Sequence, residues 1–187
     1  MRIDKLTVKD KRRLLERIRQ YKESPPMPDV ERAYKKKKGS TDLELYLEVC
    51  PPQSYGARVE KLYCKENGFE KVPSKLDKGD FNTPEGKYGE YKFSYAKSGK
   101  SYRYNFVQIR PWQKIDCYVL ETYSDLYGIT TFNLSKKSID TLIEKFGGLA
   151  HGTKETNTNV KKEYALRGKI GDEMWDEMSQ LNESNLL

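Results

Sequence analysis

Residues 78–94, KGDFNTPEGKYGEYKFS, decide how this chain folds. The TPEG run in their middle consists of residues that favour turns, and the segments on either side have the composition of strands. We therefore predict a tight β-hairpin. Asp80 would open its first strand, and Glu90 and Lys92 would lie on its second strand.

The hairpin predicts that Asp80, Glu90 and Lys92 lie close together. Glu90 and Lys92 are two residues apart, so their side chains point to the same face of a strand. Two carboxylates can share one divalent cation, and oxygen ligands suit Mg²⁺. A metal ion beside a lysine favours phosphodiester hydrolysis, because the metal activates water and the lysine stabilises developing negative charge. The alternative is a chance pattern, since 34% of the residues are charged.

The charge distribution indicates an anionic partner. The chain has 187 residues, enough for one domain with a sizeable core, and a net charge of +7. Residues 1–40 hold 14 Lys or Arg and 6 Asp or Glu, whereas the rest of the chain holds 21 and 22. Such a basic arm favours nucleic acid as the partner. A solvated arm that aids solubility explains the Lys35–Lys38 run equally well.

Other features exclude several classes of protein. No stretch approaches the roughly 20 apolar residues of a membrane span, and no signal-peptide pattern is present, so we expect a cytoplasmic protein. Cys50, Cys64 and Cys117 lack paired spacing and are expected to be reduced thiols, not zinc ligands. His151 is the only histidine, which excludes sites built from several histidines. No glycine-rich nucleotide-binding loop occurs.

The pattern of apolar residues and turn signals divides the chain into helices and strands. A basic helical extension is expected over residues 1–53, with the main domain over 54–187. Predicted helices cover 8–22, 29–38, 42–50, 54–67, 135–146, 160–166 and 172–181. Predicted strands cover 69–73, 80–83, 88–95, 102–109, 117–123 and 129–134, and residues 111–116 form a short helix or turn.

This order of elements resembles the core of the PD-(D/E)XK nucleases, the superfamily that includes most type II restriction endonucleases. The two halves of its motif are similar to Lys78-Gly79-Asp80-Phe81 and Glu90-Tyr91-Lys92-Phe93-Ser94. The later run 106–113, FVQIRPWQ, also resembles segments of restriction-type members. The resemblance covers about residues 54–146. It departs from the family at Gly79, which replaces the proline, and in a short gap between the carboxylates.

The resemblance implies an α/β fold with a restriction-endonuclease-like core, in which helices flank a central mixed sheet, with an N-terminal helical extension and a C-terminal helix. It implies that Asp80 and Glu90 bind Mg²⁺, that the Tyr91 backbone carbonyl is a further ligand, and that Lys92 assists the attacking water. Glu60, on the helix before the sheet, is the candidate for an additional acidic ligand. Its alternative is a surface glutamate paired with a neighbouring basic residue.

Further residues are candidates for catalysis or for DNA contacts. Gln108 lies on the strand after the motif, where it could orient water, although ordinary packing is the alternative. Arg110 and Gln113 lie on a turn, and Arg and Gln side chains read guanine and adenine edges. Arg110 could equally clamp a phosphate or form a structural ion pair. Trp112 is expected in the core. The other candidate DNA contacts are the lysines Lys97, Lys100 and Lys154.

The function that these expectations favour is a magnesium-dependent endonuclease acting on duplex DNA, with the sequence specificity of a type II restriction enzyme. A homodimer is expected, because one site per chain cuts one strand. No membrane partner and no small-molecule cofactor beyond the metal are expected. The alternatives are a structure-directed or repair nuclease of the same superfamily, and a non-catalytic nucleic-acid-binding protein.

Overall fold

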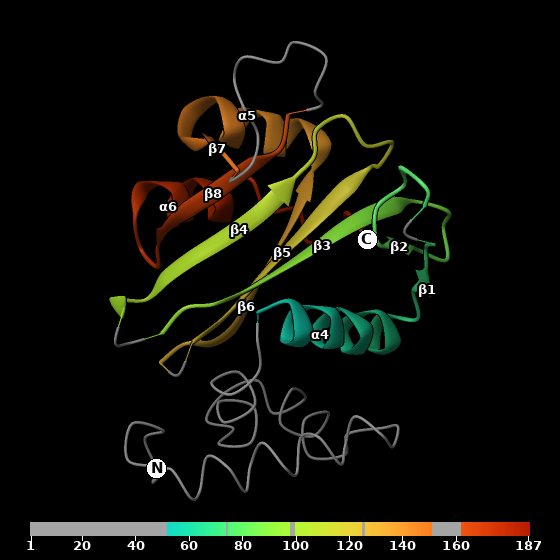
Figure 1. Ribbon diagram of the computed structural model, residues 1–187, viewed down its shortest axis with the longest axis horizontal. Coiled ribbons are helices and arrows are strands. Elements are labelled where there is room, and N and C mark those ends of the chain that lie inside the picture. The colour runs from blue at the N-terminus through green and yellow to red at the C-terminus, as the bar shows by residue number, and fades with distance from the viewer. Residues whose placement is uncertain (1–51, 74, 98–99, 125, 151–161) are drawn as a thin grey trace, which may run out of the picture.

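A five-stranded mixed sheet forms the centre of the chain in the computed structural model, which describes residues 52–73, 75–97, 100–124, 126–150 and 162–187 (Figure 1). The strand order is β1-β2-β3-β5-β6. Strands β3 and β5 pair in parallel, and all other pairs of this sheet are antiparallel. The bounds are β1 (Glu70–Lys71), β2 (Phe81–Asn82), β3 (Tyr88–Tyr95), β5 (Cys117–Ser124) and β6 (Gly128–Ser135). The α/β class and the mixed central sheet are thus as predicted.

A second, three-stranded sheet lies beside the first. It consists of β4 (Arg103–Ile109), β7 (Gly148–Leu149) and β8 (Tyr164–Lys169), in the order β4-β8-β7, with both pairs antiparallel. The Ser94 hydroxyl on β3 accepts a hydrogen bond from the Asn105 amide on β4 at 2.8 Å. This bond fixes β4 against β3.

Helices cover both sides of the central sheet. Helix α4 (Pro52–Asn67) packs on one face, and the second sheet lies with α5 (Lys136–Phe146) and α6 (Glu173–Gln180) on the other (Figure 1). Ser135 caps α5 by accepting a hydrogen bond from the Ser138 amide, and Asp172 caps α6 in the same way from the Trp175 amide. Both caps are positions where the sequence predicts helix starts.

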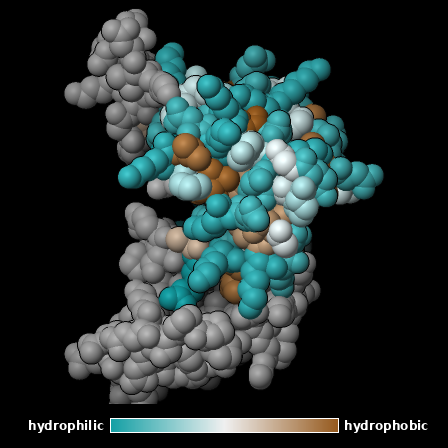
Figure 2. Space-filling model, turned by 90° about the vertical axis from the view of Figure 1, so that its right-hand side faces the viewer, coloured by the Kyte–Doolittle hydropathy of each residue, from teal (hydrophilic) through white to brown (hydrophobic). Residues whose placement is uncertain are grey.

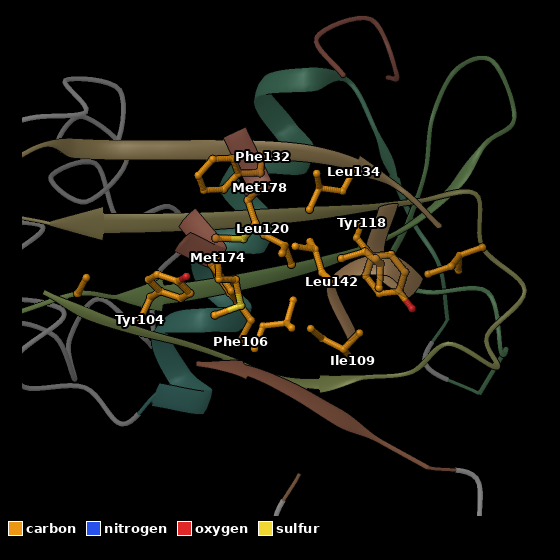
Figure 3. Packing of buried hydrophobic residues seen from close by; sticks show 14 residues of the cluster. Tyr104, Phe106, Ile109, Tyr118, Leu120, Phe132, Leu134, Leu142, Met174 and Met178 are labelled. Carbon is orange, nitrogen blue, oxygen red and sulfur yellow. The ribbon is translucent and has the colours of Figure 1, made fainter. Parts of the chain in front are cut away.

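Two apolar clusters fill the spaces between these layers. The larger cluster joins the two sheets to α5 and α6, and Figure 3 shows its side chains pointing toward one another. It includes Tyr104, Phe106, Ile109, Tyr118, Leu120, Phe132, Leu134, Leu142, Met174 and Met178. The smaller cluster joins α4 to the opposite face and includes Val59, Tyr63, Phe81, Tyr91 and Val119. Strand β5 lies between the clusters, and all of its residues are buried, as expected for an interior strand.

The hairpin quoted from the sequence is present. Phe81 pairs with Gly89 and Asn82 pairs with Tyr88, so β2 and β3 lie antiparallel across the predicted turn. Gly79 has a φ of +75°, and a Cβ there would lie 2.3 Å from the Gly89 carbonyl oxygen. The close approach of the chain before Asp80 to β3 therefore requires glycine.

One expectation differs from the structure. The predicted helix at 160–166 is wrong in its described part, because Tyr164 begins strand β8, which pairs with β4 on one side and β7 on the other. Long-range pairing decides this segment, not its weak local pattern. The described part of the connection from β3 to β5 holds strand β4 and a turn, as the sequence predicts for residues 102–109 and 111–116. The predicted helices 8–22, 29–38 and 42–50 lie outside the described residues.

No helix in the described part of the chain is long and apolar enough to cross a membrane.

We predict opposite effects for two glycine substitutions. Gly89→Ala should destabilise the protein by about 1–3 kcal/mol, because the new Cβ would lie 2.2 Å from the buried Phe81 ring. Gly56→Ala is the matched control in α4, where a new Cβ would meet no described atom within 4 Å beyond its own helix turn, and it should stabilise the protein by about 0.5–1 kcal/mol. Urea unfolding measures both. Equal effects of the two substitutions would contradict the close packing of the hairpin.

Candidate functional site

The hairpin holds Asp80 from two directions. The Asp80 amide donates a hydrogen bond to the Gly89 carbonyl at 2.8 Å. The Asp80 Oδ2 atom accepts a hydrogen bond from the Tyr91 amide at 3.0 Å. Both partners belong to β3, so the carboxylate is fixed beside the strand that carries Glu90 and Lys92.

Glu90 and Lys92 point to the face of β3 that β4 covers. The Lys92 ammonium donates a hydrogen bond to Glu90 Oε1 and lies 4.0 Å from Asp80 Oδ2. The structure therefore brings together the three residues that the hairpin pattern predicts to be neighbours. The two carboxylates converge on one cationic group.

Glu90 is a buried carboxylate with polar partners. Its side chain is 2% exposed, and the Gln113 Nε2 atom donates a hydrogen bond to its Oε2 atom at 3.2 Å. Burial raises the pKa of Glu90 above its ordinary value, and the negative charge of Asp80 raises it further, whereas Lys92 and Gln113 lower it. Protonation of Glu90 is therefore easier than that of an ordinary glutamate.

Glu60 lies on α4. It forms an ion pair with Lys71 on β1 at 2.9 Å. Burial raises the pKa of Glu60, and Asp80 raises it further, while Lys71 and Lys92 act in the opposite direction. The charges of Asp80 and Lys92 thus both act on Glu60, whose direct partner is Lys71.

The sequence suggests that Gln113 contacts a DNA base. The structure places its side chain in a buried position instead. It lies on the turn after β4 but is 5% exposed, with its amide nitrogen directed at Glu90. Its Oε1 atom is buried without a hydrogen-bond partner among the described residues. The Lys136 ammonium donates to the Gln113 backbone carbonyl at 2.6 Å and fixes the turn. In this conformation Gln113 is part of the carboxylate cluster and cannot contact a base.

Glu121 is a buried acid that the sequence reasoning did not single out. It is 1% exposed on β5 and accepts hydrogen bonds from the Tyr91 hydroxyl at 2.7 Å and from the Thr131 hydroxyl at 3.1 Å. Tyr91 is thus fixed at two points: its hydroxyl bonds to Glu121, and its backbone amide bonds to Asp80. The available signal was a glutamate within the apolar run CYVLETY.

The other predicted site residues lie apart from the carboxylates, with no hydrogen bond or ion pair to them in the described residues. Arg110 forms an ion pair with Glu163 at 2.8 Å, the structural role held open for it. Gln108 is exposed on β4, in the second sheet, with a φ of +57°. The Lys97 ammonium lies 5.2 Å from the centre of the Tyr95 ring, and Lys100 is exposed. Lys154 and His151 lie outside the described residues.

The site lies at the edge of the central sheet that is formed by β1 and β2. Figure 2 shows this end of the molecule, where hydrophilic side chains dominate and a few hydrophobic ones lie between them. Within the described residues, no group of three or more His, Cys, Asp or Glu side chains is arranged to hold a metal ion. Burial also raises the pKa of Cys64 to about 11 and of Cys117 to about 12, so these thiols are protonated at neutral pH.

No protein-family model matches the chain, and no curated protein matches its sequence.

The raised pKa of Glu90 predicts a pH-dependent stability difference. At pH values above the ordinary 4.5, native Glu90 still holds a proton that the unfolded chain has lost. Wild-type stability should therefore fall, relative to that of Glu90→Gln, as pH rises from 4.5 through the raised pKa of Glu90. Unfolding free energies from urea titrations at a series of pH values, without divalent cations, measure the difference.

Glu85→Gln is the matched control, because Glu85 is an exposed carboxylate in the turn of the same hairpin. A stability difference between wild type and Glu90→Gln that stays constant with pH, or that changes in the opposite direction, contradicts the burial of an easily protonated Glu90.

Proposed function

We propose that this chain is a magnesium-dependent endonuclease that hydrolyses phosphodiester bonds in duplex DNA. The observation that carries the proposal is the convergence of Asp80, Glu90 and Lys92 on one hairpin. Two carboxylates and one ammonium group at a single point provide ligands for a cation and a positive charge for a phosphoryl group. The resemblance to the PD-(D/E)XK motif rests on the same three residues.

The donor atoms at this point fit magnesium. Mg²⁺ is typically bound by one or two carboxylates and keeps several waters, and Asp80 and Glu90 supply two carboxylates. The N–H and C=O of one residue in a strand face the same neighbour. The Tyr91 carbonyl therefore faces the side on which its amide meets Asp80. Bound there, magnesium would polarise the phosphoryl group and lower the pKa of a water molecule.

The Lys92 ammonium lies between the carboxylates that would hold the cation. It must leave Glu90 Oε1 before both carboxylates can face a divalent ion. Once released, it remains on the same strand face, where it can orient the attacking water and stabilise the negative charge that develops on the phosphoryl oxygens. Gln113 keeps Glu90 oriented during this exchange through its hydrogen bond to Oε2.

Glu60 is a candidate additional ligand in this proposal. Its carboxylate is held by Lys71 and must be released from that ion pair to reach the cation. The negative charge of Asp80 acts on Glu60 in the structure, which supports Glu60 as the candidate.

The finer proposal is a sequence-specific enzyme of the restriction type that acts as a homodimer. One site per chain cuts one strand, so two copies related by a two-fold axis would cut both strands of a symmetric sequence. A structure-directed nuclease of the same superfamily would use the same site on junctions or mismatches, and a non-catalytic protein would bind DNA without cutting it.

We predict that duplex cleavage requires both Mg²⁺ and the hairpin residues. Asp80→Asn removes a metal ligand and Lys92→Met removes the ammonium group, and each should lower the cleavage rate by at least about 100-fold. The test follows the conversion of supercoiled and linear DNA with Mg²⁺ and with EDTA. Lys137→Met, a change at an exposed lysine of α5, is the matched control and should cut at the wild-type rate.

The products separate the alternatives. Discrete fragments from linear duplex indicate sequence specificity, whereas a smear or cleavage restricted to branched substrates favours the structure-directed enzyme. Wild-type cleavage by Lys92→Met, or activity that persists in EDTA, overturns the proposed site. Binding without any strand scission leaves the non-catalytic protein as the correct alternative.

A further inference from the structure

The strands of the second sheet carry only positive charge. Strands β4, β7 and β8 contain Arg103, Arg167 and Lys169 and no aspartate or glutamate. All three cationic residues are exposed, and none forms an ion pair with another described residue. The nearest acid in the sequence, Asp172, accepts hydrogen bonds from the Lys169 and Trp175 amides and caps α6.

The register of the sheet brings these cations together on one face. Arg103 and Lys169 are directly opposite partners, and Asn105 and Arg167 are the next such pair. Opposite partners point to the same face, as do residues two apart on one strand. Arg103, Asn105, Arg167 and Lys169 therefore share one side of the sheet, which we call the basic sheet face.

The basic sheet face is the outer one. Tyr104, Phe106 and Leu166, which alternate with its members, are buried in the larger apolar cluster. The Arg167 Nε atom donates a hydrogen bond to Asn105 Oδ1 at 3.2 Å, and its guanidinium reaches across to β7, 3.8 Å from where a Cβ of Gly148 would lie. The cations are therefore presented from strands whose inner side is firmly packed.

Within the described residues, this arrangement is electrostatically unfavourable. Like charges directly opposite one another destabilise a strand pair, and the described residues supply no acidic side chain to neutralise Arg103, Lys169 or Arg167. A polyanion laid along the face would relieve that repulsion. Side chains two apart on a strand are about 6.8 Å apart. This is close to two base steps along the axis of a duplex, in which each strand carries one phosphate per ~3.4 Å of axis.

The chemistry of the face favours nucleic acid over a lipid surface. The affinity of a protein surface for a membrane increases with the apolar area that it buries between the lipids. The only exposed large hydrophobic residue in the described strands β4, β7 and β8 is Val107. The guanidinium groups of Arg103 and Arg167, by contrast, match phosphate geometry.

The basic sheet face is also connected to the carboxylate site. Strand β4 lies beside β3 (Figure 1), held by the Ser94–Asn105 hydrogen bond. At its end, β4 runs into the turn that carries Gln113, whose amide contacts Glu90. A nucleic-acid strand that binds along β4 would therefore extend toward the hairpin.

We propose that the basic sheet face binds the sugar-phosphate backbone of the nucleic-acid substrate. In naming duplex DNA the inference rests on the proposed nuclease function, but the binding itself requires neither magnesium nor cleavage. Arg103, Arg167 and Lys169 contact phosphates, and Asn105 fixes the orientation of Arg167.

The test is binding of a fluorescent DNA duplex to the full chain in EDTA, by anisotropy at several salt concentrations. The triple variant Arg103→Gln, Arg167→Gln and Lys169→Gln should bind about 10- to 100-fold more weakly than wild type, and its log–log salt slope should fall by about 0.9 for each lost phosphate contact. The triple Lys61→Gln, Lys65→Gln and Lys137→Gln removes the same charge from exposed helix positions and should keep wild-type binding. Circular dichroism and thermal melting verify that both triples fold.

Charge-preserving changes give a second test. The double variant Arg103→Lys and Arg167→Lys keeps all three positive charges of the face. It should therefore bind DNA with most of the wild-type affinity, unlike the glutamine triple. Equal losses in the two glutamine triples, or undiminished binding by the basic-sheet-face triple, overturn the inference. The inference is also overturned if the basic-sheet-face triple loses binding to anionic lipid vesicles but binds DNA as tightly as wild type.

The binding assay and the cleavage assay can fail separately. Loss of affinity in the basic-sheet-face triple together with no cleavage by wild type supports the binding surface and contradicts the nuclease. Normal cleavage and normal binding by the same triple contradict only the binding surface.

Discussion

The hydrogen bond from the Tyr91 amide to Asp80 is the contact on which the geometry of the site depends. It ties a carboxylate from outside the strand to the backbone between Glu90 and Lys92. Two negative groups are thereby held close together, one of them buried, an arrangement that costs free energy unless a cation compensates. In the structure that cation is the Lys92 ammonium, which bonds to Glu90 and lies near Asp80.

The surrounding packing serves to hold β3 in place. The Tyr91 hydroxyl is fixed by buried Glu121, and Ser94 binds the backbone of β4. The smaller cluster supports the strand from the side of α4, and the larger cluster supports the opposite face. Because both faces of the sheet are packed, the side chains of Glu90 and Lys92 have few alternative positions. The second sheet is packed in the same way, because its inner residues belong to the larger cluster and hold the strands that carry the exposed cations.

Local patterns in the sequence were sufficient for much of the fold. The turn residues between Asp80 and Glu90 predict the hairpin, and the strand of residues 88–95 has the predicted bounds. Ser135 and Asp172 mark helix starts by their capping chemistry. Strand β8 was missed because its partners are distant in the sequence, so its local pattern carries little information about pairing.

The candidate site was predictable to the same extent. The spacing of Asp80, Glu90 and Lys92 was enough to place them together, because a hairpin converts sequence distance into a contact. The roles of Gln113 and Glu121 were not predictable, because each depends on a turn or a strand from another part of the fold. The basic sheet face was not predictable from the sequence for a similar reason. Arg103 and Lys169 are far apart in the sequence and meet only through the register of β4 and β8.

The most direct test of the account is to follow the backbone amide of Tyr91 by NMR during a titration with Mg²⁺. This amide donates to Asp80 Oδ2 and lies between the two carboxylate residues, so it reports on the site itself. We predict a saturable shift of the Tyr91 signal in wild type, and its loss in Asp80→Asn and in Glu90→Gln. A Tyr91 signal that does not respond to Mg²⁺ in wild type, or that responds equally in both variants, would contradict a magnesium site on the hairpin.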